Sequence, residues 1–159
     1  MDKIVPSLWF EKSAEEAAEF YVSLFDGSRI LDVARYTDAG PGETGSAMTV
    51  TFELAGQRFL AINGGPHDEF NDAVSFQIQC EDQAEVDRLW DALTAHGGRE
   101  VQCGWCKDRY GMSWQVIPKR LGELLSAPDR EAADRAMKAM LGMKKIDVGA
   151  LERAAAGEE

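Results

Sequence analysis

The stretch VQCGWCKDRYGMSWQVIP holds two cysteines, Cys103 and Cys106, in the C-x-x-C spacing that thiol redox proteins and zinc sites use. A redox pair of this kind needs its first cysteine at a helix N-terminus, where the helix dipole lowers the thiol pKa. The residues that follow, Lys107–Gly111, are instead a turn sequence leading into an apolar strand. We therefore expect both thiols to be small residues on a strand, with a thiol redox protein as an alternative.

A structural zinc site would need two more ligands beside the cysteine pair. The remaining candidates are Cys80, His67 and His96, and none stands at a spacing that pairs them. His67 lies in a glycine-rich loop, and His96 closes a predicted helix, where a cationic imidazole suits the helix dipole. The residue types and their spacing therefore predict no zinc site.

The elements that position these residues follow the same order twice: a strand, a helix and three strands. In the first half a strand is predicted at Lys3–Phe10, and Ser13–Glu16 has the pattern of a capping box that opens a helix ending at Gly27. The helix is followed by predicted strands at Arg29–Tyr36, Ser46–Leu54 and Gln57–Asn63. Ala55-Gly56 is expected to form a tight hairpin turn between the last two strands.

The second half repeats this order. A strand is predicted at Ala73–Cys80 and a helix at Asp82–His96. Three short strands are predicted after it, at Arg99–Cys103, Gly104–Asp108 and Met112–Pro118. A shift of about 70 residues places Gly27 over Gly97, which is typical of a duplicated supersecondary unit.

Beyond Pro118 the pattern becomes helical. Leu121–Leu125 predicts a short helix, Pro128 is expected at the first position of another, and Val148–Ala155 predicts a last amphipathic helix. The middle helix carries an apolar stripe made of Ala133, Ala136, Met137, Met140 and Leu141. Because a methionine-bearing stripe is usually a packing surface, we expect residues 119–159 to cover a sheet or a partner subunit.

The charge balance excludes several classes of partner. The chain has 28 acidic and 17 basic residues and a formal net charge of -11, which repels nucleic acid phosphates and anionic lipid headgroups. No uncharged run reaches the roughly 18 residues of a membrane-spanning helix, and the N-terminus has no signal-peptide pattern. Three cysteines, an odd number, suit a reducing compartment. We expect a cytoplasmic protein without nucleic acid or membrane partners.

The segments VPSLWFEKSAEEAAEFYVSLFDGS, GWCKDRYGMSWQVIP and AMKAMLGMKKIDVGALERAAAG, together with the repeated element order, carry a family resemblance. They resemble the PhnB-like group of the vicinal oxygen chelate superfamily, which includes glyoxalases, bleomycin-resistance proteins and dioxygenases. Members of this group are often labelled 3-demethylubiquinone-9 3-methyltransferase. The chain shows no glycine-rich strand-to-helix turn with a downstream acid of the kind that a nucleotide-like methyl donor would need.

The resemblance covers essentially the whole chain and implies its architecture. It implies an α+β fold in which two βαβββ modules, at about 1–66 and 70–118, curl into a cup-like mixed sheet within one domain, residues 1–118. Residues 119–159 would form an added helical extension. Sheet edges and the apolar tail lead us to expect a homodimer.

The resemblance also implies where a divalent metal would bind, because superfamily enzymes carry their ligands on the first and last strands of each module. Only Gln115 falls on such a position, and Leu60, Val5–Ser7 and Ala73–Ser75 offer no matching set. A catalytic metal needs about three protein ligands and an open position. We therefore expect no metal and no other cofactor.

A metal-independent binder of a small, partly apolar molecule is the function that we expect. The alternatives are a divalent-metal-dependent isomerase, lyase or dioxygenase, and a thiol redox protein that uses Cys103 and Cys106. Because neighbours on a strand face opposite sides, Gln115 rather than Trp114 is expected to point into the cup. The residues expected around the ligand are Gln115, Gln77, Asn63, Ser75, Trp9, Trp105 and Cys103. The residues identify neither the ligand nor a reaction.

Overall fold

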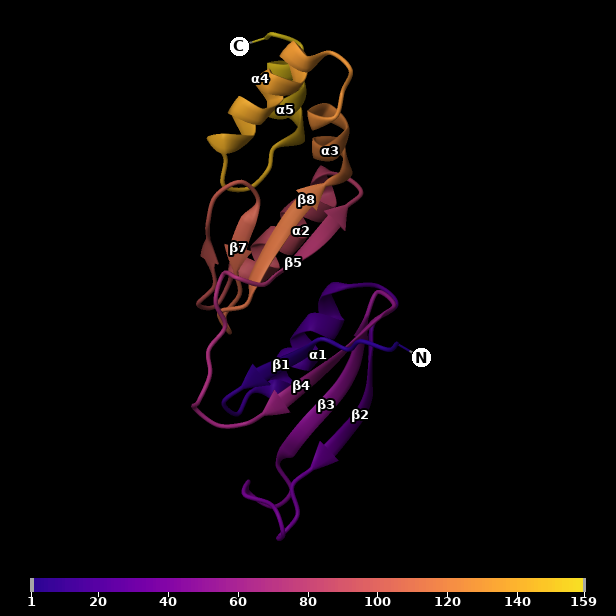
Figure 1. Ribbon diagram of the computed structural model, residues 1–159, viewed down its shortest axis with the longest axis vertical. Helices are drawn as coiled ribbons and strands as arrows, with labels where there is room; N and C mark the ends of the chain where they lie inside the picture. The colour runs from indigo at the N-terminus through magenta and orange to yellow at the C-terminus, as the bar shows by residue number, and fades with distance from the viewer. Residues whose placement is uncertain (1, 159) are drawn as a thin grey trace. The chain divides into compact units, whose positions relative to one another are not determined.

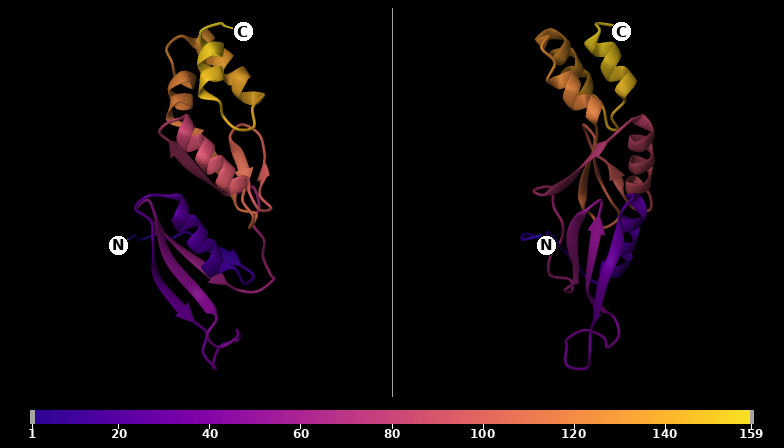
Figure 2. Two further views of the ribbon diagram at one scale, coloured as in Figure 1. Left: turned by 180° about the vertical axis from the view of Figure 1, so that it is seen from behind. Right: turned by 90° about the vertical axis from the view of Figure 1, so that its right-hand side faces the viewer.

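The computed structural model describes residues 2–158. Within them the protein divides into two compact units, with the boundary between Phe70 and Asn71, and each unit has its own four-stranded mixed sheet (Figure 1). In each unit one helix lies along one face of the sheet (Figure 2). The predicted α+β class, with two strand-helix-three-strand modules and C-terminal helices, is confirmed. None of the helices over residues 2–158 is both long enough and apolar enough to cross a membrane.

The first unit follows the predicted element order. Its elements are β1 (Ser7–Phe10), α1 (Ala14–Leu24), β2 (Arg29–Arg35), β3 (Ala47–Leu54) and β4 (Gln57–Asn63). Strand β1 pairs in parallel with β4, β3 pairs antiparallel with β4 and β2, and the sheet order is β1-β4-β3-β2. The alternation of β3 buries Val50 and Phe52 completely, and the ring of Phe52 stacks on Tyr21 of α1. The tight turn at Ala55-Gly56 is present, with positive φ at both residues.

Helix α1 does not begin with the predicted capping box. The side chain of its N-cap residue, Ser13, makes no capping hydrogen bond within the described part of the chain. Instead the Ala14 N–H donates to Oδ1 of Asn63 at 2.8 Å, and Nδ2 of Asn63 donates to the carbonyl of Ala47 at 3.0 Å. The capping-box prediction was wrong, because a side chain from β4 supplies the acceptor that the helix terminus needs.

The second unit repeats the arrangement with shorter strands. Its sheet and helix are β5 (Ser75–Cys80), α2 (Gln83–Thr94), β6 (Arg99–Glu100), β7 (Trp105–Lys107) and β8 (Ser113–Pro118). The sheet order is β5-β8-β7-β6, with β5 and β8 parallel. The buried residues Ile78, Cys80, Cys106, Trp114 and Val116 alternate with the residues of the opposite face, among them Gln77, Gln79, Trp105 and Gln115.

Strands β6 and β7 are shorter than predicted because the chain reverses at Cys103 and Gly104. These residues have positive φ values of 56° and 84°, and the Trp105 N–H donates to the carbonyl of Gln102 at 3.0 Å. Two left-handed residues in succession form the tight turn that joins twisted antiparallel strands. Cys103 therefore lies in a turn, not on a strand as predicted, and Cys106 lies on β7.

Helices α3 (Lys119–Leu125), α4 (Arg130–Leu141) and α5 (Val148–Ala155) form the C-terminal extension. Helix α4 begins two residues after the predicted Pro128, since Asp129 caps it by accepting from the Ala132 N–H. The side chains that pack the helices together are Leu121, Leu124, Ala136, Ile146 and Leu151. Met137 and Leu141, expected on the packing stripe, are instead 40% and 60% exposed.

The loop between α4 and α5 ties the extension to the second sheet. The N–H groups of Cys103 and Gly104 donate to the carbonyls of Met143 and Lys144, each at 2.8 Å. On the other side, the Gln83 side chain donates to the carbonyl of Ile146 at 3.0 Å and accepts from the Val148 N–H at 2.8 Å. The extension therefore belongs to the second unit, as the division of the chain also shows. Two expectations stay predictions: that the extension covers a partner subunit, and that the two modules join into one domain.

Candidate functional site

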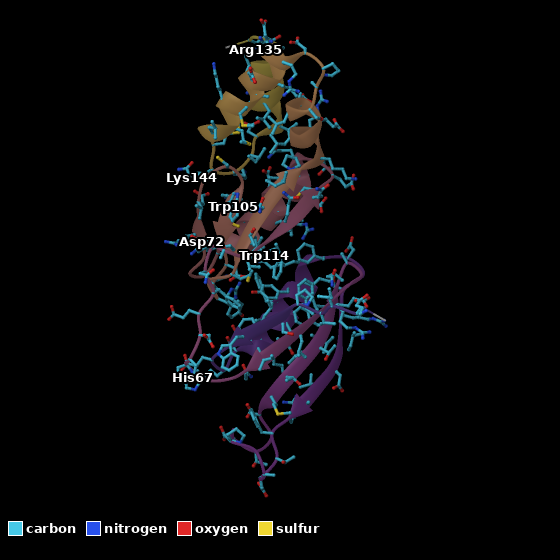
Figure 3. All side chains as sticks on the ribbon, viewed as in Figure 1. His67, Asp72, Trp105, Trp114, Arg135 and Lys144 are labelled. Carbon is cyan, nitrogen blue, oxygen red and sulfur yellow. The ribbon has the colours of Figure 1, made fainter. Side chains whose placement is uncertain are left out.

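A pocket of about 430 Å³ lies between the sheet of the second unit and the C-terminal extension. Its floor is the sheet face turned away from α2, and its wall comes from α3 and α4. The lining residues are Gln77, Gln79, Cys103, Trp105, Gln115, Ile117, Pro118, Lys119, Leu121, Gly122, Leu125 and Met140. Trp105 lies nearer to the C-terminal helices than Trp114 does (Figure 3).

A row of carboxamides crosses the floor. Gln79 Nε2 donates to Gln77 Oε1 at 3.3 Å, and Gln77 Nε2 donates to Gln115 Oε1 at 3.3 Å. Gln115 Nε2 then donates to Ser75 Oγ at 2.8 Å. The row forms because Ser75, Gln77 and Gln79 alternate along β5, and the parallel register places Gln77 beside Gln115 of β8. We call Gln77, Gln79 and Gln115 the glutamine row.

The rest of the lining is mainly apolar. Ile117 belongs to the floor, and Leu121, Leu125 and Met140 belong to the helical wall. Among the described residues, Lys119 is the one charged residue of the lining, and its ammonium forms an ion pair with Glu81. The pocket therefore offers neutral hydrogen-bonding groups on one side and hydrocarbon on the other.

The structure gathers most of the predicted ligand residues in this pocket. Gln115, Gln77, Trp105 and Cys103 line it, and Ser75 is hydrogen-bonded to Gln115. The other eight lining residues were missed, among them Gln79 on the floor and the apolar residues Leu125 and Met140 on the wall. Gln79 could have been found, because it stands two positions after Gln77 on one strand. Nothing in the sequence could place the two apolar residues, because they come from helices outside the repeated modules.

Asn63 and Trp9 belong to the first unit and are not among the residues that line this pocket. Asn63 borders a separate pocket of about 340 Å³ in that unit, but both ends of its amide are engaged with Ala14 and Ala47. Trp9 Nε1 donates to the carbonyl of Gly65 at 3.0 Å. Their role toward a ligand stays a prediction.

A buried carboxylate sets the geometry of the β7–β8 hairpin. Asp108 is 2% exposed, and its Oδ1 accepts from the N–H groups of Tyr110 and Met112 at 2.8 and 3.1 Å. Its Oδ2 accepts from Trp114 Nε1 at 2.8 Å. With Trp114 held on the α2 side of the sheet, strand alternation turns Gln115 to the pocket side.

The thiols do not have the environment of a redox pair. All three cysteines are free, and Cys80 and Cys106 are fully buried. Burial, with smaller contributions from Asp108 and Glu100, raises the pKa of Cys106 to about 12. A redox cysteine needs the opposite shift, because the thiolate is the nucleophile. The alternative of a thiol redox protein therefore gains no support from this geometry.

Alkylation kinetics test this interpretation. In the native protein at about pH 8, close to the ordinary thiol pKa, iodoacetamide should modify Cys103 while Cys80 and Cys106 stay unmodified. A raised pKa keeps both buried groups as thiols until the pH approaches about 12. All three should react after unfolding in urea, as peptide mass spectrometry would show. Comparable native rates for Cys103 and Cys106 would restore the thiol alternative.

The donor groups near Gln115 do not fit a divalent metal. Within residues 2–158, no cluster of three His, Cys, Asp or Glu side chains is placed to hold a metal ion. Gln115 accepts from Gln77 and donates to Ser75, so its neutral amide is part of the row. A catalytic metal site needs about three protein ligands, and hard cations favour charged oxygens.

Two strand-helix-three-strand modules with open mixed sheets are the architecture that the resemblance to the vicinal oxygen chelate superfamily implies. A family model described as 3-demethylubiquinone-9 3-methyltransferase matches residues 2–117. The chain belongs to this PhnB-like family. The match ends before α3, so the helices of the extension lie outside it.

Solved structures agree with this assignment. A putative 3-demethylubiquinone-9 3-methyltransferase, PhnB protein, from Bacillus cereus is 36% identical, with a TM-score of 0.68, and the match covers 74% of this chain and 99% of that one. Protein PA1353 from Pseudomonas aeruginosa has a TM-score of 0.62 at 22% identity, covering 74% of this chain and 98% of that one, which shows the fold alone. The comparison with curated proteins found no match.

Proposed function

We propose that this protein binds a small, partly apolar molecule in the pocket of its second unit, without a metal. The observation that carries the proposal is the composition of the pocket, where the glutamine row faces a wall of leucine and methionine side chains. The volume of about 430 Å³ lies within the range of small-molecule pockets. Apolar walls with a few placed polar groups are the usual makeup of such sites.

The wall is suited to hold the apolar part of a ligand. Leu121 is 4% exposed and belongs to the core of the extension, so its position is fixed by packing. Leu125 and Met140 pack against the same core and also border the pocket. Burial of apolar ligand surface here contributes about 25 cal/mol per Å², and the amides set the orientation of the ligand.

Methyl transfer, named in the description of the family model, is not part of this proposal. Methyl transfer needs a methyl donor, and a nucleotide-like donor would be expected where a glycine-rich turn joins a strand to a helix. The connection from β1 to α1 is Glu11-Lys12-Ser13, and the connection from β5 to α2 is Glu81-Asp82, so neither contains a glycine.

The test is a titration with 2-naphthol, followed by the side-chain N–H resonances of Trp105 and Gln115, with and without a metal chelator. We expect saturable shifts that the chelator does not change. Leu125→Glu places a carboxylate on the wall and should weaken binding at least about tenfold, because a desolvated charge is costly. Met137→Glu is the matched control, since Met137 lies on α4, is 40% exposed and is not in the lining.

Two results would overturn the proposal. One is the absence of any saturable shift in the wild-type protein up to millimolar probe. The other is binding that requires added manganese or zinc, which would favour the metal-dependent superfamily enzyme instead.

A further inference from the structure

We propose that the ligand of this pocket is a neutral, planar molecule with an amide-type edge, in which an N–H donor stands beside a carbonyl acceptor, joined to an apolar ring. This inference rests on the proposed function of the same pocket and deepens it. Three observations support it: the direction of the glutamine row, the charge of the lining, and the position of Trp105 (Figure 3).

The glutamine row runs in one direction. Each carboxamide has two N–H donors and a carbonyl with two acceptor positions. Within residues 2–158 Gln77 uses one of each, because it accepts from Gln79 and donates to Gln115, which leaves a second N–H and a second lone pair. Aligned amides polarise one another, which strengthens the hydrogen bonds that their remaining N–H and carbonyl groups can make to a ligand. A ligand amide can accept from the free N–H of a glutamine and donate to its free lone pair, just as a further carboxamide added to the row could.

The row also offers both kinds of hydrogen-bonding group to the pocket. Among the described residues, Gln79 Oε1 accepts no hydrogen bond, and one of the two N–H groups of Gln77 Nε2 donates none. A ligand with only acceptors, or only donors, would leave one kind of group without a partner. Gln77 and Gln79 are exposed in the free protein, but a bound ligand would shield them from water, and polar groups then left without partners cost free energy, so the lining selects for a ligand that carries both.

The lining disfavours charged ligands. Lys119 already pairs with Glu81, and no acidic side chain of residues 2–158 lines the pocket. An anion would meet no unpaired cation there, and it would approach a chain with a formal charge of -11. A cation would find no carboxylate. Transfer of an unpaired charge from water to such a lining is unfavourable.

The position of Trp105 favours a flat ligand. It stands directly opposite Gln115 in the β7–β8 ladder, so its side chain and the Gln115 amide lie side by side on the pocket face. A molecule hydrogen-bonded to Gln115 therefore lies next to the indole. Aromatic rings prefer offset stacking or edge contact with another ring, and a flat ring also fits against Leu125 and Met140.

The experiment compares three bicyclic probes of similar size by NMR titration: 2-quinolinone, which carries the lactam edge, quinoline, which has an acceptor alone, and the anion 2-naphthoate. We expect 2-quinolinone to bind the wild-type protein at least about tenfold more tightly than either of the others. In Gln115→Met this preference should disappear. Gln57→Met, on an exposed strand end of the first unit, should leave it unchanged.

Should Gln115→Met fail to fold, Gln77→Met gives the same test at an exposed position of the row. Equal or tighter binding of quinoline or 2-naphthoate would overturn the ligand class while leaving the pocket established as a binding site. If none of the three probes shifts the Trp105 and Gln115 resonances, the ligand class is overturned, and the 2-naphthol titration decides separately whether the proposed function stands.

Discussion

Asp108→Ala is expected to lower the free energy of unfolding by about 3–5 kcal/mol. The substitution leaves the N–H groups of Tyr110 and Met112 and the indole N–H of Trp114 without their acceptor. Because Trp114 is 3% exposed, water does not readily replace the carboxylate at the indole. Urea unfolding followed by tryptophan fluorescence would measure the loss.

Two further variants test whether the loss of stability in Asp108→Ala comes from the burial of the carboxylate and the number of hydrogen bonds that it accepts. Asp108→Asn keeps an oxygen for the two backbone donors but turns an amide nitrogen toward the indole, so it should cost an intermediate amount, about 1–3 kcal/mol. Asp72→Ala is the matched control. Asp72 accepts from Ser113 and pairs with Lys107, which lowers its pKa, yet it is 70% exposed and should contribute far less. Equal losses for Asp108→Ala and Asp72→Ala would contradict this account.

Ile146→Ala is expected to cost about 2–5 kcal/mol and to loosen the wall of the pocket. Ile146 is fully buried, packs among Leu121, Leu124 and Leu151, and lies in the loop that ties the extension to the second sheet. Loss of its side chain leaves a cavity at the joint between helix and sheet. The amides of Cys103 and Gly104, which donate to this loop, should then exchange with solvent faster.

Ile146→Val removes one methylene and should cost about 1 kcal/mol. Leu141→Ala, at a position 60% exposed on α4, serves as the control and should change stability little. Hydrogen exchange measured by NMR would separate local loosening from global unfolding. Unchanged exchange at Cys103 and Gly104 in Ile146→Ala would show that the loop does not hold the extension.

The family match ends before the C-terminal extension, so the extension supplies a part of the pocket that lies outside the match. The match covers residues 2–117, which include the glutamine row and Trp105. Leu121, Leu125 and Met140 lie beyond it. The floor of the pocket therefore comes from the shared modules and its apolar wall from the extension. If the proposed function holds, the wall distinguishes this chain from relatives that end with the modules.

Local patterns in the sequence determined the element order and the faces of the strands. Period-two alternation placed Gln77 and Gln115 on one face and Trp114 on the other, because a strand turns successive side chains to opposite sides. Helical spacing gave α5 its observed bounds, Val148–Ala155. These features depend on neighbours within a few positions of the chain, so they are readable without the fold.

Only the tertiary structure decided which partners meet across long separations. Asn63 caps α1 in place of Ser13, the backbone of Cys103 is held in a turn by the α4–α5 loop, and Met140 reaches the pocket of a sheet that it follows by many residues. Hydrogen bonds and packing between distant segments depend on how the chain is folded, and residue spacing carries no record of them. For that reason the glutamine face was predictable, whereas the wall that makes it a pocket was not.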